Sequence, residues 1–362
     1  MRWIIILTMS WQTLSSAIRI GNFKFSGIHE VRITKSIHTL NDAATIQLPT
    51  IAYYIPTGSS TPVRVVTGEL PDFEDGSPVQ IDLGYNGNLN SEFTGFVKRR
   101  GTGMPLVLEC EGYVRQLRNN KNITYDCTKT ATTAAKLLAL ACQGTDVTVS
   151  CPVDFPIKGV KFVKANGVQI CDAIKDISAG CLTIFFITPK TLWCGLAYTA
   201  YAGGNNPFGI DYQVDYRLGY NCMRQNGLKE RVPSEPVQIF FKGKYATGAL
   251  LYNASKEKAA KNKVTHLSSQ IPDNVTMGKF AQEKAYAHNY IGYEGTLTGF
   301  LEPYAYAGMN CNIVNAEYAD LNGIYLTEAT DVRFGVSGAR SVITIGPKLN
   351  YGNTTAYNQL NG

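Results

Sequence analysis

Apolar and polar residues alternate along much of the first third of the chain. Between residues 30 and 48, the apolar residues that fall on one face of the predicted strands are Val31, Ile33, Ile37, Ala44, Ile46 and Leu48. A period of two is typical of strands with one buried face. With a further strand at 63–70, residues 18–118 predict six or more strands and almost no helix, which is enough to curl into a small barrel.

One pattern in this region occurs twice. In 76–117, Gly76 opens a strand and Phe93 follows 17 residues later; in 308–346, Gly308 opens a strand and Tyr325 follows at the same offset. The other matching features are Val79 and Ile81 against Cys311 and Ile313, Arg99 against Arg333, and the glycine turns at Gly101 and Gly335. Any antiparallel meander has alternation of this kind. The shared order of features nevertheless predicts two three-stranded meanders at equivalent positions of two similar barrels.

The period changes near residue 128, where helices are predicted. Thr132 or Thr133 is placed to cap a helix that ends at Gly144. A second helix has Val168, Cys171, Ile174 and Ile177 on one face and stops at Gly180. Two strands then follow, joined at Pro189-Lys190. Residues 125–205 therefore predict a small α+β module.

Strands resume between 212 and 251, and 253–275 is polar and rich in lysine, which predicts a loop or an extension. A short helix is expected after Thr276, before the second meander. The fold class predicted is mainly β with a small α+β module and two tube-like β-barrel domains related by internal duplication. The predicted parts are an N-terminal arm (1–17), a first tube-like β-barrel (18–124), the α+β module (125–205), a second tube-like β-barrel with a helical and polar insertion (206–349) and a loose tail (350–362).

Composition narrows the class of protein. Charged residues make up 17% of the 362 residues, against about a quarter in an average soluble domain. The net charge of +6 is modest and scattered, which favours solvated faces over a nucleic-acid patch. Nine cysteines without a CxxC motif indicate free thiols and assembly in a reducing compartment. The apolar stretch 3–11 resembles a short signal peptide, but polar residues interrupt it, so a structural arm or edge strand is expected. No apolar run reaches the length of a membrane span.

Candidate chemistry is sparse. The four histidines, His29, His38, His266 and His288, form no HExxH motif, and no Walker loop or dinucleotide fingerprint is present. Glu109 and Glu111 are two apart on a predicted strand, so both are expected on its outer face in water. We therefore assign no catalytic, cofactor-binding or metal-binding residue and expect a protein that is not an enzyme and has no cofactor.

Four stretches, in this order, carry a resemblance to a known family: IRIGNFKF and its continuation at 18–49, DGSPVQID and its continuation at 75–117, VQICDAIK and its continuation at 168–198, and GTLTGFLE and its continuation at 295–346. In order and spacing the chain resembles the baseplate hub proteins of tailed phages. That group includes the late-control D proteins and the hub portion of type VI spike proteins. Residues 1–17 are extra relative to that pattern.

The resemblance implies a structural hub in which two tube-like barrels per chain form a homotrimer and present a pseudo-sixfold ring. Such a ring joins the sixfold tail tube to the threefold central spike or tail-tip protein and continues the tail channel. Other baseplate proteins are implied as partners, and DNA or the tape-measure protein would pass through the lumen without sequence-specific binding. The implied location is the virion tail baseplate or tip of a phage or contractile injection system, assembled in the bacterial host cytoplasm. The alternatives are a virion-surface protein that binds carbohydrate or a receptor, and a cell-wall hydrolase.

Overall fold

The computed structural model describes residues 12–25, 27–56, 59–69, 73–199, 206–223, 227–244, 250–256 and 260–349. The chain forms two compact units. Unit 1 takes its residues from Met1–Arg32, Thr45–Cys110 and Arg333–Ala339, and unit 2 from Ile33–Ala44, Glu111–Val332 and Arg340–Gly362. The architecture is mainly β with few helices, as the alternation predicted.

Unit 1 is built from the first strands of the chain. Its elements are β1 (Leu14–Ile20), β2 (Phe23–Phe25), β5 (Ile51–Ile55), β6 (Val63–Val66), a 3-10 turn (Thr67–Glu69), β7 (Pro78–Tyr85), β8 (Asn88–Arg100) and β9 (Leu106–Glu111). Strands β3 (Glu30–Ser36), β4 (Ala43–Leu48), β24 (Gly323–Gly335) and β25 (Gly338–Lys348) contribute residues to both units, and the last residue of β9, Glu111, belongs to unit 2. In unit 1 the order of hydrogen-bonded neighbouring strands in the sheet is β4-β9-β8-β7-β1-β2-β5-β6.

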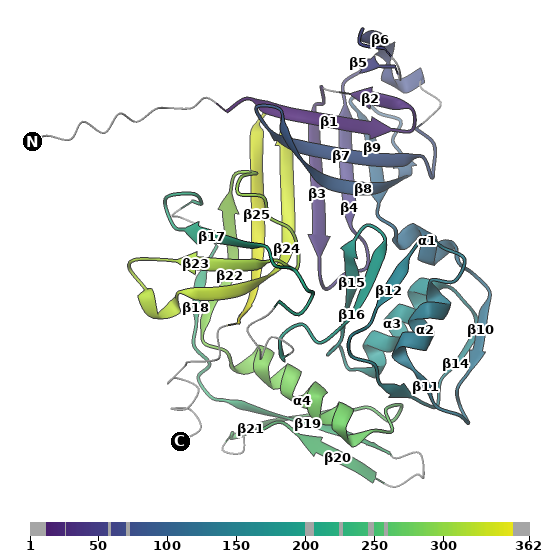
Figure 1. Ribbon diagram of the computed structural model, residues 1–362, viewed down its shortest axis with the longest axis vertical. Helices are drawn as coiled ribbons and strands as arrows, with labels where there is room; N and C mark the ends of the chain where they lie inside the picture. Colours follow the sequence, from purple (N-terminus) through teal and green to yellow (C-terminus); the bar gives the residue numbers. More distant parts are fainter. Residues whose placement is uncertain are drawn as a thin grey trace, which may run out of the picture. The chain divides into compact units, whose positions relative to one another are not determined.

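The alternation in β7 places its apolar side chains in the core of unit 1. Val79, Ile81 and Leu83 are all buried, and Ile81 lies opposite Ile18 of β1. Strand β1 runs between β2 and β7 and is not an edge strand (Figure 1). Residues 14–17 of the expected arm therefore belong to the sheet, while residues 1–11 and the expected tail 350–362 lie outside the described residues.

Unit 2 holds the helices and the remaining strands. Its elements are α1 (Val114–Asn119), β10 (Ile123–Asp126), β11 (Thr132–Thr133), α2 (Ala134–Ala141), β12 (Thr148–Ser150), β13 (Pro156–Ile157), β14 (Lys161–Ala165), α3 (Gly167–Ile177), β15 (Thr183–Thr188), β16 (Thr191–Gly195), β17 (Gln213–Arg217), β18 (Lys229–Arg231), β19 (Val237–Lys244), β20 (Leu250–Ala254), β21 (Asn262–Leu267), α4 (Asn274–Asn289), β22 (Gly292–Gly299), β23 (Asn310–Val314) and a 3-10 turn (Ala319–Leu321). None of the helices in these described parts is long and apolar enough to cross a membrane.

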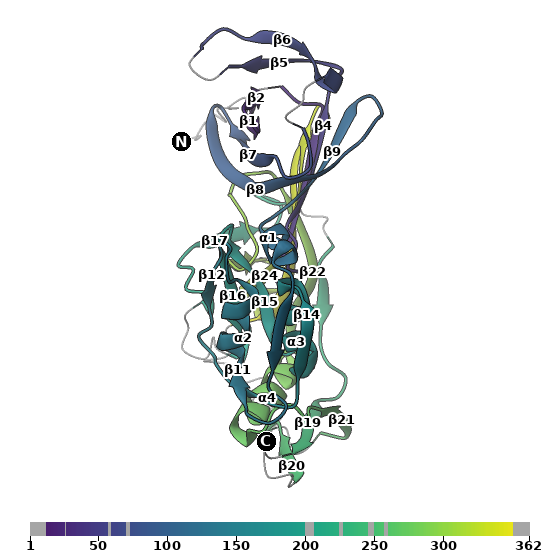
Figure 2. The same ribbon diagram turned by 90° about the vertical axis from the view of Figure 1, so that its right-hand side faces the viewer.

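The predicted helices form as the sequence indicated. Thr133 caps α2, because its side chain accepts a hydrogen bond from the Lys136 N–H, and Asn166 caps α3 through a capping box with Gln169. Gly180 closes the end of α3 with φ 70°. Helices α2 and α3 pack against each other (Figure 2). They share one apolar cluster with residues of α4 and β19, so the predicted insertion packs on the α+β module.

Two segments differ from the prediction. The polar stretch 253–275, expected as a loop, contains the last two residues of β20 and all of β21, and both strands pair with β19. Strand β21 exposes almost all of its side chains, so no alternation marks it in the sequence. Helix α4 begins at Asn274, ahead of the expected start, because Asp273 caps it by accepting the N–H groups of Val275 and Thr276.

Both meanders open on a glycine with a similar, positive φ. Gly76 has φ 92° and Gly308 has φ 94°. In each copy the facing residue, Val97 or Thr327, accepts the glycine N–H at 2.8 Å. It returns its own N–H to the carbonyl of the residue after the glycine, at 2.8 Å in the first copy and 3.0 Å in the second. A positive φ at this position favours glycine, because it is strained for most residues that carry a Cβ.

The register of the two meanders differs beyond this point. Phe93 lies opposite Ile81, whereas Tyr325 lies opposite Cys311, and Cys311 has the offset from its glycine that Val79 has in the first copy. The predicted match between Phe93 and Tyr325 is therefore wrong by two residues. A shift of two keeps a side chain on the same face of a strand, and both aromatic rings are buried.

The turns explain the shift. In the first copy β7 and β8 are joined by the two-residue turn 86–87, in which both residues have positive φ. In the second copy β23 and β24 are joined by the longer stretch 315–322, which contains a 3-10 turn. Because turn geometry fixes the register of a hairpin, two different turns give two different alignments of the same strand pattern.

Candidate functional site

A cluster of hydrogen-bonded polar side chains lies within unit 2, around the buried carboxyl group of Glu283. Glu283 projects from α4, Tyr198 and Thr199 follow β16, His38 follows β3, and Glu328 lies on β24. These side chains come from segments far apart in the sequence. One helix and three strands position them, so the cluster is set by tertiary packing.

Glu283 is 2% exposed. Its carboxylate accepts the Tyr198 N–H at 2.9 Å, the Thr199 N–H at 2.7 Å and the Thr199 hydroxyl at 2.6 Å. Burial raises the pKa of Glu283, and the hydrogen bonds from Thr199 and its neighbours oppose that rise. The carboxyl group therefore ties α4 to the segment that leaves β16.

Glu328 forms a second acceptor beside the first. It accepts the Tyr198 hydroxyl, and its Oε2 lies 3.2 Å from the His38 Nε2. Burial, together with the charge of Glu328, raises the pKa of Tyr198 well above 10.0. Gly346 makes room for this carboxylate, because a Cβ at that position would lie 2.5 Å from Glu328 Oε1.

A cavity of about 350 Å³ lies beside these groups. Its lining includes Lys175, Cys181, Tyr198 and Lys284. The Lys175 ammonium donates to the His38 carbonyl at 3.1 Å, and burial lowers the pKa of Lys175. Burial raises the pKa of the Cys181 thiol, so both the thiol and the Tyr198 phenol stay protonated and supply no anionic nucleophile. The cluster is a hydrogen-bonded anchor for its segments.

The four histidines occupy separate elements. His29 precedes β3, His38 follows it, His266 lies on β21 and His288 lies in the last turn of α4. Burial lowers the pKa of His266 and of His288. Only His38 enters the polar cluster, where it pairs with Glu328. Over the described ranges, no group of three or more His, Cys, Asp or Glu side chains could hold a metal ion.

The pair Glu109 and Glu111 does not share one exposed face. Glu109 pairs with Arg99 at 2.6 Å near the surface, but Glu111 is 1% exposed. Glu111 pairs with Arg115 at 3.5 Å and with Arg118. The expectation that both face water is wrong for Glu111, because two arginines of α1 pair with its carboxylate at the end of β9. A buried carboxylate with two guanidinium partners is a structural ion cluster.

Sequence reasoning missed the Glu283 cluster. Glu283 interrupts the apolar face of α4 beside Phe280 and Ala281, and a carboxylate in a helix pattern is usually assigned to the exposed side. Its partners Tyr198 and Thr199 are more than 80 residues away. The one local signal of a buried carboxylate was the position of Glu283, which helical spacing places on the same face as buried residues.

No protein-family model and no curated protein sequence matches this chain. Solved structures do share its fold. The tail protein from Neisseria meningitidis MC58 has a TM-score of 0.62 and 12% identity, over 92% of this chain and 96% of that one. The 43 kDa tail protein of prophage MuSo2 from Shewanella oneidensis has a TM-score of 0.57 and 11% identity, over 92% of this chain and 98% of that one.

A third structure belongs to a secretion machine. The Escherichia coli c3393 protein is described as a component of the type VI secretion system with structural similarity to the bacteriophage T4 tail proteins gp27 and gp5. It has a TM-score of 0.52 and 10% identity, over 95% of this chain and 80% of that one. The fold of this chain is therefore that of phage tail proteins and of a type VI secretion component.

Proposed function

We propose that the chain is a structural hub of a phage tail or of a phage-like injection machine. In this proposal three copies form a closed ring, each copy contributes two tube-like barrels, and the ring joins the sixfold tail tube to the threefold central spike and continues the channel. The observation that carries the proposal is the fold shared with phage tail proteins over 92% of the chain.

The repeated glycine motif supports two barrels per chain. Gly76 and Gly308 have the same φ and the same pair of hydrogen bonds to the facing strand. A trimer whose subunits each carry two similar barrels presents six similar units, and closed cyclic symmetry is how such rings assemble. The domain limits that go with this proposal are 18–124 and 206–349 for the barrels and 125–205 for the module between them.

A structural role also agrees with the chemistry of the Glu283 cluster. Its carboxylates are occupied by donors, and its thiol and phenol groups are held protonated. We propose that the protein is not an enzyme. Its proposed partners are further copies of itself, the tube protein, the spike or tail-tip protein and other baseplate proteins, and its proposed location is the virion tail, reached by assembly in the bacterial host cytoplasm.

Sedimentation velocity of the purified full chain tests the proposal. The expected result, at raised protein concentration, is a species of three times the 39.6 kDa chain mass. The measurement is repeated with the tube protein added, because a partner can nucleate the ring. A chain that stays monomeric in both conditions contradicts the proposal. Glycan-array binding by that monomer would support a receptor-binding protein, and clearing of peptidoglycan gels would support a wall hydrolase.

A further inference from the structure

Cys151 follows the end of β12, and Cys194 lies in β16, the strand that pairs with β12 in parallel in unit 2. Strands β12 and β16 pair in the register Thr148 with Thr191, Val149 with Leu192 and Ser150 with Trp193. The next residue of each segment is a cysteine, Cys151 directly after β12 and Cys194 within β16, so the same register places them level with each other. Neighbouring strands lie about 4.8 Å apart, which falls within the Cα separation of about 4.4–6.8 Å that a disulfide spans.

The two side chains point to the same apolar cluster. Cys194 is fully buried within the cluster that α2 and α3 form, and Cys151 packs against that cluster from its partly exposed edge. Of the nine free cysteines, Cys151 is the one that is not buried. A hydrogen bond from the Cys194 thiol lowers the pKa of Cys151, although burial opposes this, and the same contact raises the pKa of Cys194 well above 9.0. Thiolate character is therefore concentrated on the sulfur that a reagent can reach.

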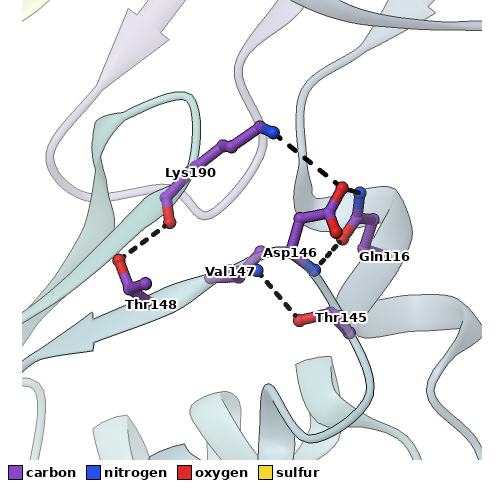
Figure 3. A network of polar contacts seen from close by, with 6 residues as sticks. All are labelled: Gln116, Thr145, Asp146, Val147, Thr148 and Lys190. Carbon is purple, nitrogen blue, oxygen red and sulfur yellow. Dashed lines mark hydrogen bonds and ion pairs between the residues drawn. The ribbon is translucent and has the colours of Figure 1, made fainter.

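Polar contacts fix the register that brings the two cysteines together (Figure 3). The Thr148 N–H donates to the Lys190 carbonyl at 2.8 Å, and the Thr148 hydroxyl donates to the same carbonyl at 3.2 Å. Just before β12, the Asp146 carboxylate lies 4.0 Å from the Lys190 ammonium. The Asp146 backbone N–H donates to the Gln116 side-chain oxygen at 2.8 Å. The start of β12 is thereby held against the turn between β15 and β16, so Cys151 stays level with Cys194.

We propose that Cys151 and Cys194 are a redox pair that closes to an intrachain disulfide when the protein meets a low-molecular-weight disulfide. The Cys151 thiolate attacks one sulfur of the reagent, whose S–S bond breaks, so that a mixed disulfide forms and one small thiolate leaves. Cys194 then loses its proton and attacks the Cys151 sulfur, which displaces the second small thiolate. The protein loses two hydrogens in total, and the reagent is reduced to two thiols.

A second pair in the same cluster serves as the matched control. Cys142 and Cys171 interact electrostatically and both belong to the apolar cluster around α2 and α3. Both thiols are buried, and burial raises the pKa of Cys142 to about 12 and raises that of Cys171 as well. Neither thiol is accessible as a thiolate, so this pair is expected to stay reduced under conditions that oxidise Cys151 and Cys194.

The test treats the folded full chain with oxidised glutathione at mildly alkaline pH, blocks the remaining thiols with an alkylating reagent after unfolding, and maps the peptides by mass spectrometry. The expected result is one linked peptide that joins Cys151 to Cys194, with Cys142 and Cys171 alkylated. In Cys194→Ser, the reaction is expected to stop with glutathione attached to Cys151. In Cys151→Ser, Cys194 is expected to remain alkylatable.

Two outcomes would overturn the inference. One is a wild-type chain in which Cys151 remains alkylatable, or keeps its glutathione, while no Cys151–Cys194 peptide forms. The other is oxidation of Cys142 and Cys171 at the same rate as the proposed pair. Both outcomes are read from the wild-type protein, so the result does not depend on the folding of either variant. A rise in Tm of several degrees on oxidation, absent from Cys151→Ser, is the accompanying physical readout.

Discussion

Replacement of Glu283 by alanine should remove a large part of the stability of unit 2. The change leaves the partly buried N–H groups of Tyr198 and Thr199 without their acceptor. An unsatisfied buried donor costs about 1–3 kcal/mol, and the Thr199 hydroxyl loses its partner as well. We expect a loss of roughly 3–5 kcal/mol in the free energy of unfolding. Glu283→Gln keeps one carbonyl oxygen as acceptor and should lose less than half as much.

Urea unfolding followed by tryptophan fluorescence measures this, because Trp193 is buried in β16 next to the affected segment. The control is Glu294→Ala, which removes a carboxylate that pairs with Arg231 at 2.8 Å but is 42% exposed. A pair of that exposure is worth about 0–1 kcal/mol. If Glu283→Ala unfolds at the same urea concentration as Glu294→Ala, the assignment of Glu283 as a structural acceptor is wrong.

Three further changes probe other parts of the chain. Burial raises the pKa of Asp42 from 3.8 to about 6, so the folded state binds a proton that the unfolded state has lost. The free energy of unfolding of the wild type should therefore fall by up to about 3 kcal/mol between pH 4 and pH 6, and that of Asp42→Asn should not. Urea unfolding that shows the same pH dependence for both proteins would contradict this. Gly346→Ala should lose about 1–3 kcal/mol by displacing Glu328, and an unchanged Tm would contradict the close packing there. Gly76→Ala and Gly308→Ala should each lower the free energy of unfolding by about 1 kcal/mol, since both glycines have positive φ. Chemical denaturation that shows a loss for only one of the two variants would show that the two meanders differ.

Alternation predicted the strands well wherever one face packs on a core. Val79, Ile81 and Cys311 are buried as their spacing indicated, because a period of two leaves a clear mark when one side is apolar. It failed at β21, whose residues 262–267 are mostly exposed and carry no periodic signal. The meander match failed at Tyr325, since offset along the chain does not report the register that a turn imposes.

The polar features could be predicted far less well than the fold. The helix caps Thr133 and Asn166 act on residues three positions away, so local sequence reveals them. Glu283 finds its donors in a segment more than 80 residues distant. Cys151 and Cys194 come together because β12 and β16 pair in parallel. They are not spaced as a CxxC motif, so the sequence does not indicate that they are neighbours. Long-range pairing of this kind is decided by topology, which a single sequence does not display.

Electron microscopy of the purified full chain, alone and with the tube protein, tests the central claim most directly. If three copies form the hub of a tail, class averages should show a closed ring with threefold symmetry, six similar densities around it and a central channel. Each chain would supply two of the six densities, one from residues 18–124 and one from residues 206–349. The repeated glycine motif predicts that these two densities resemble each other. Particles that are single chains, or closed assemblies of another symmetry without a channel, would contradict the account.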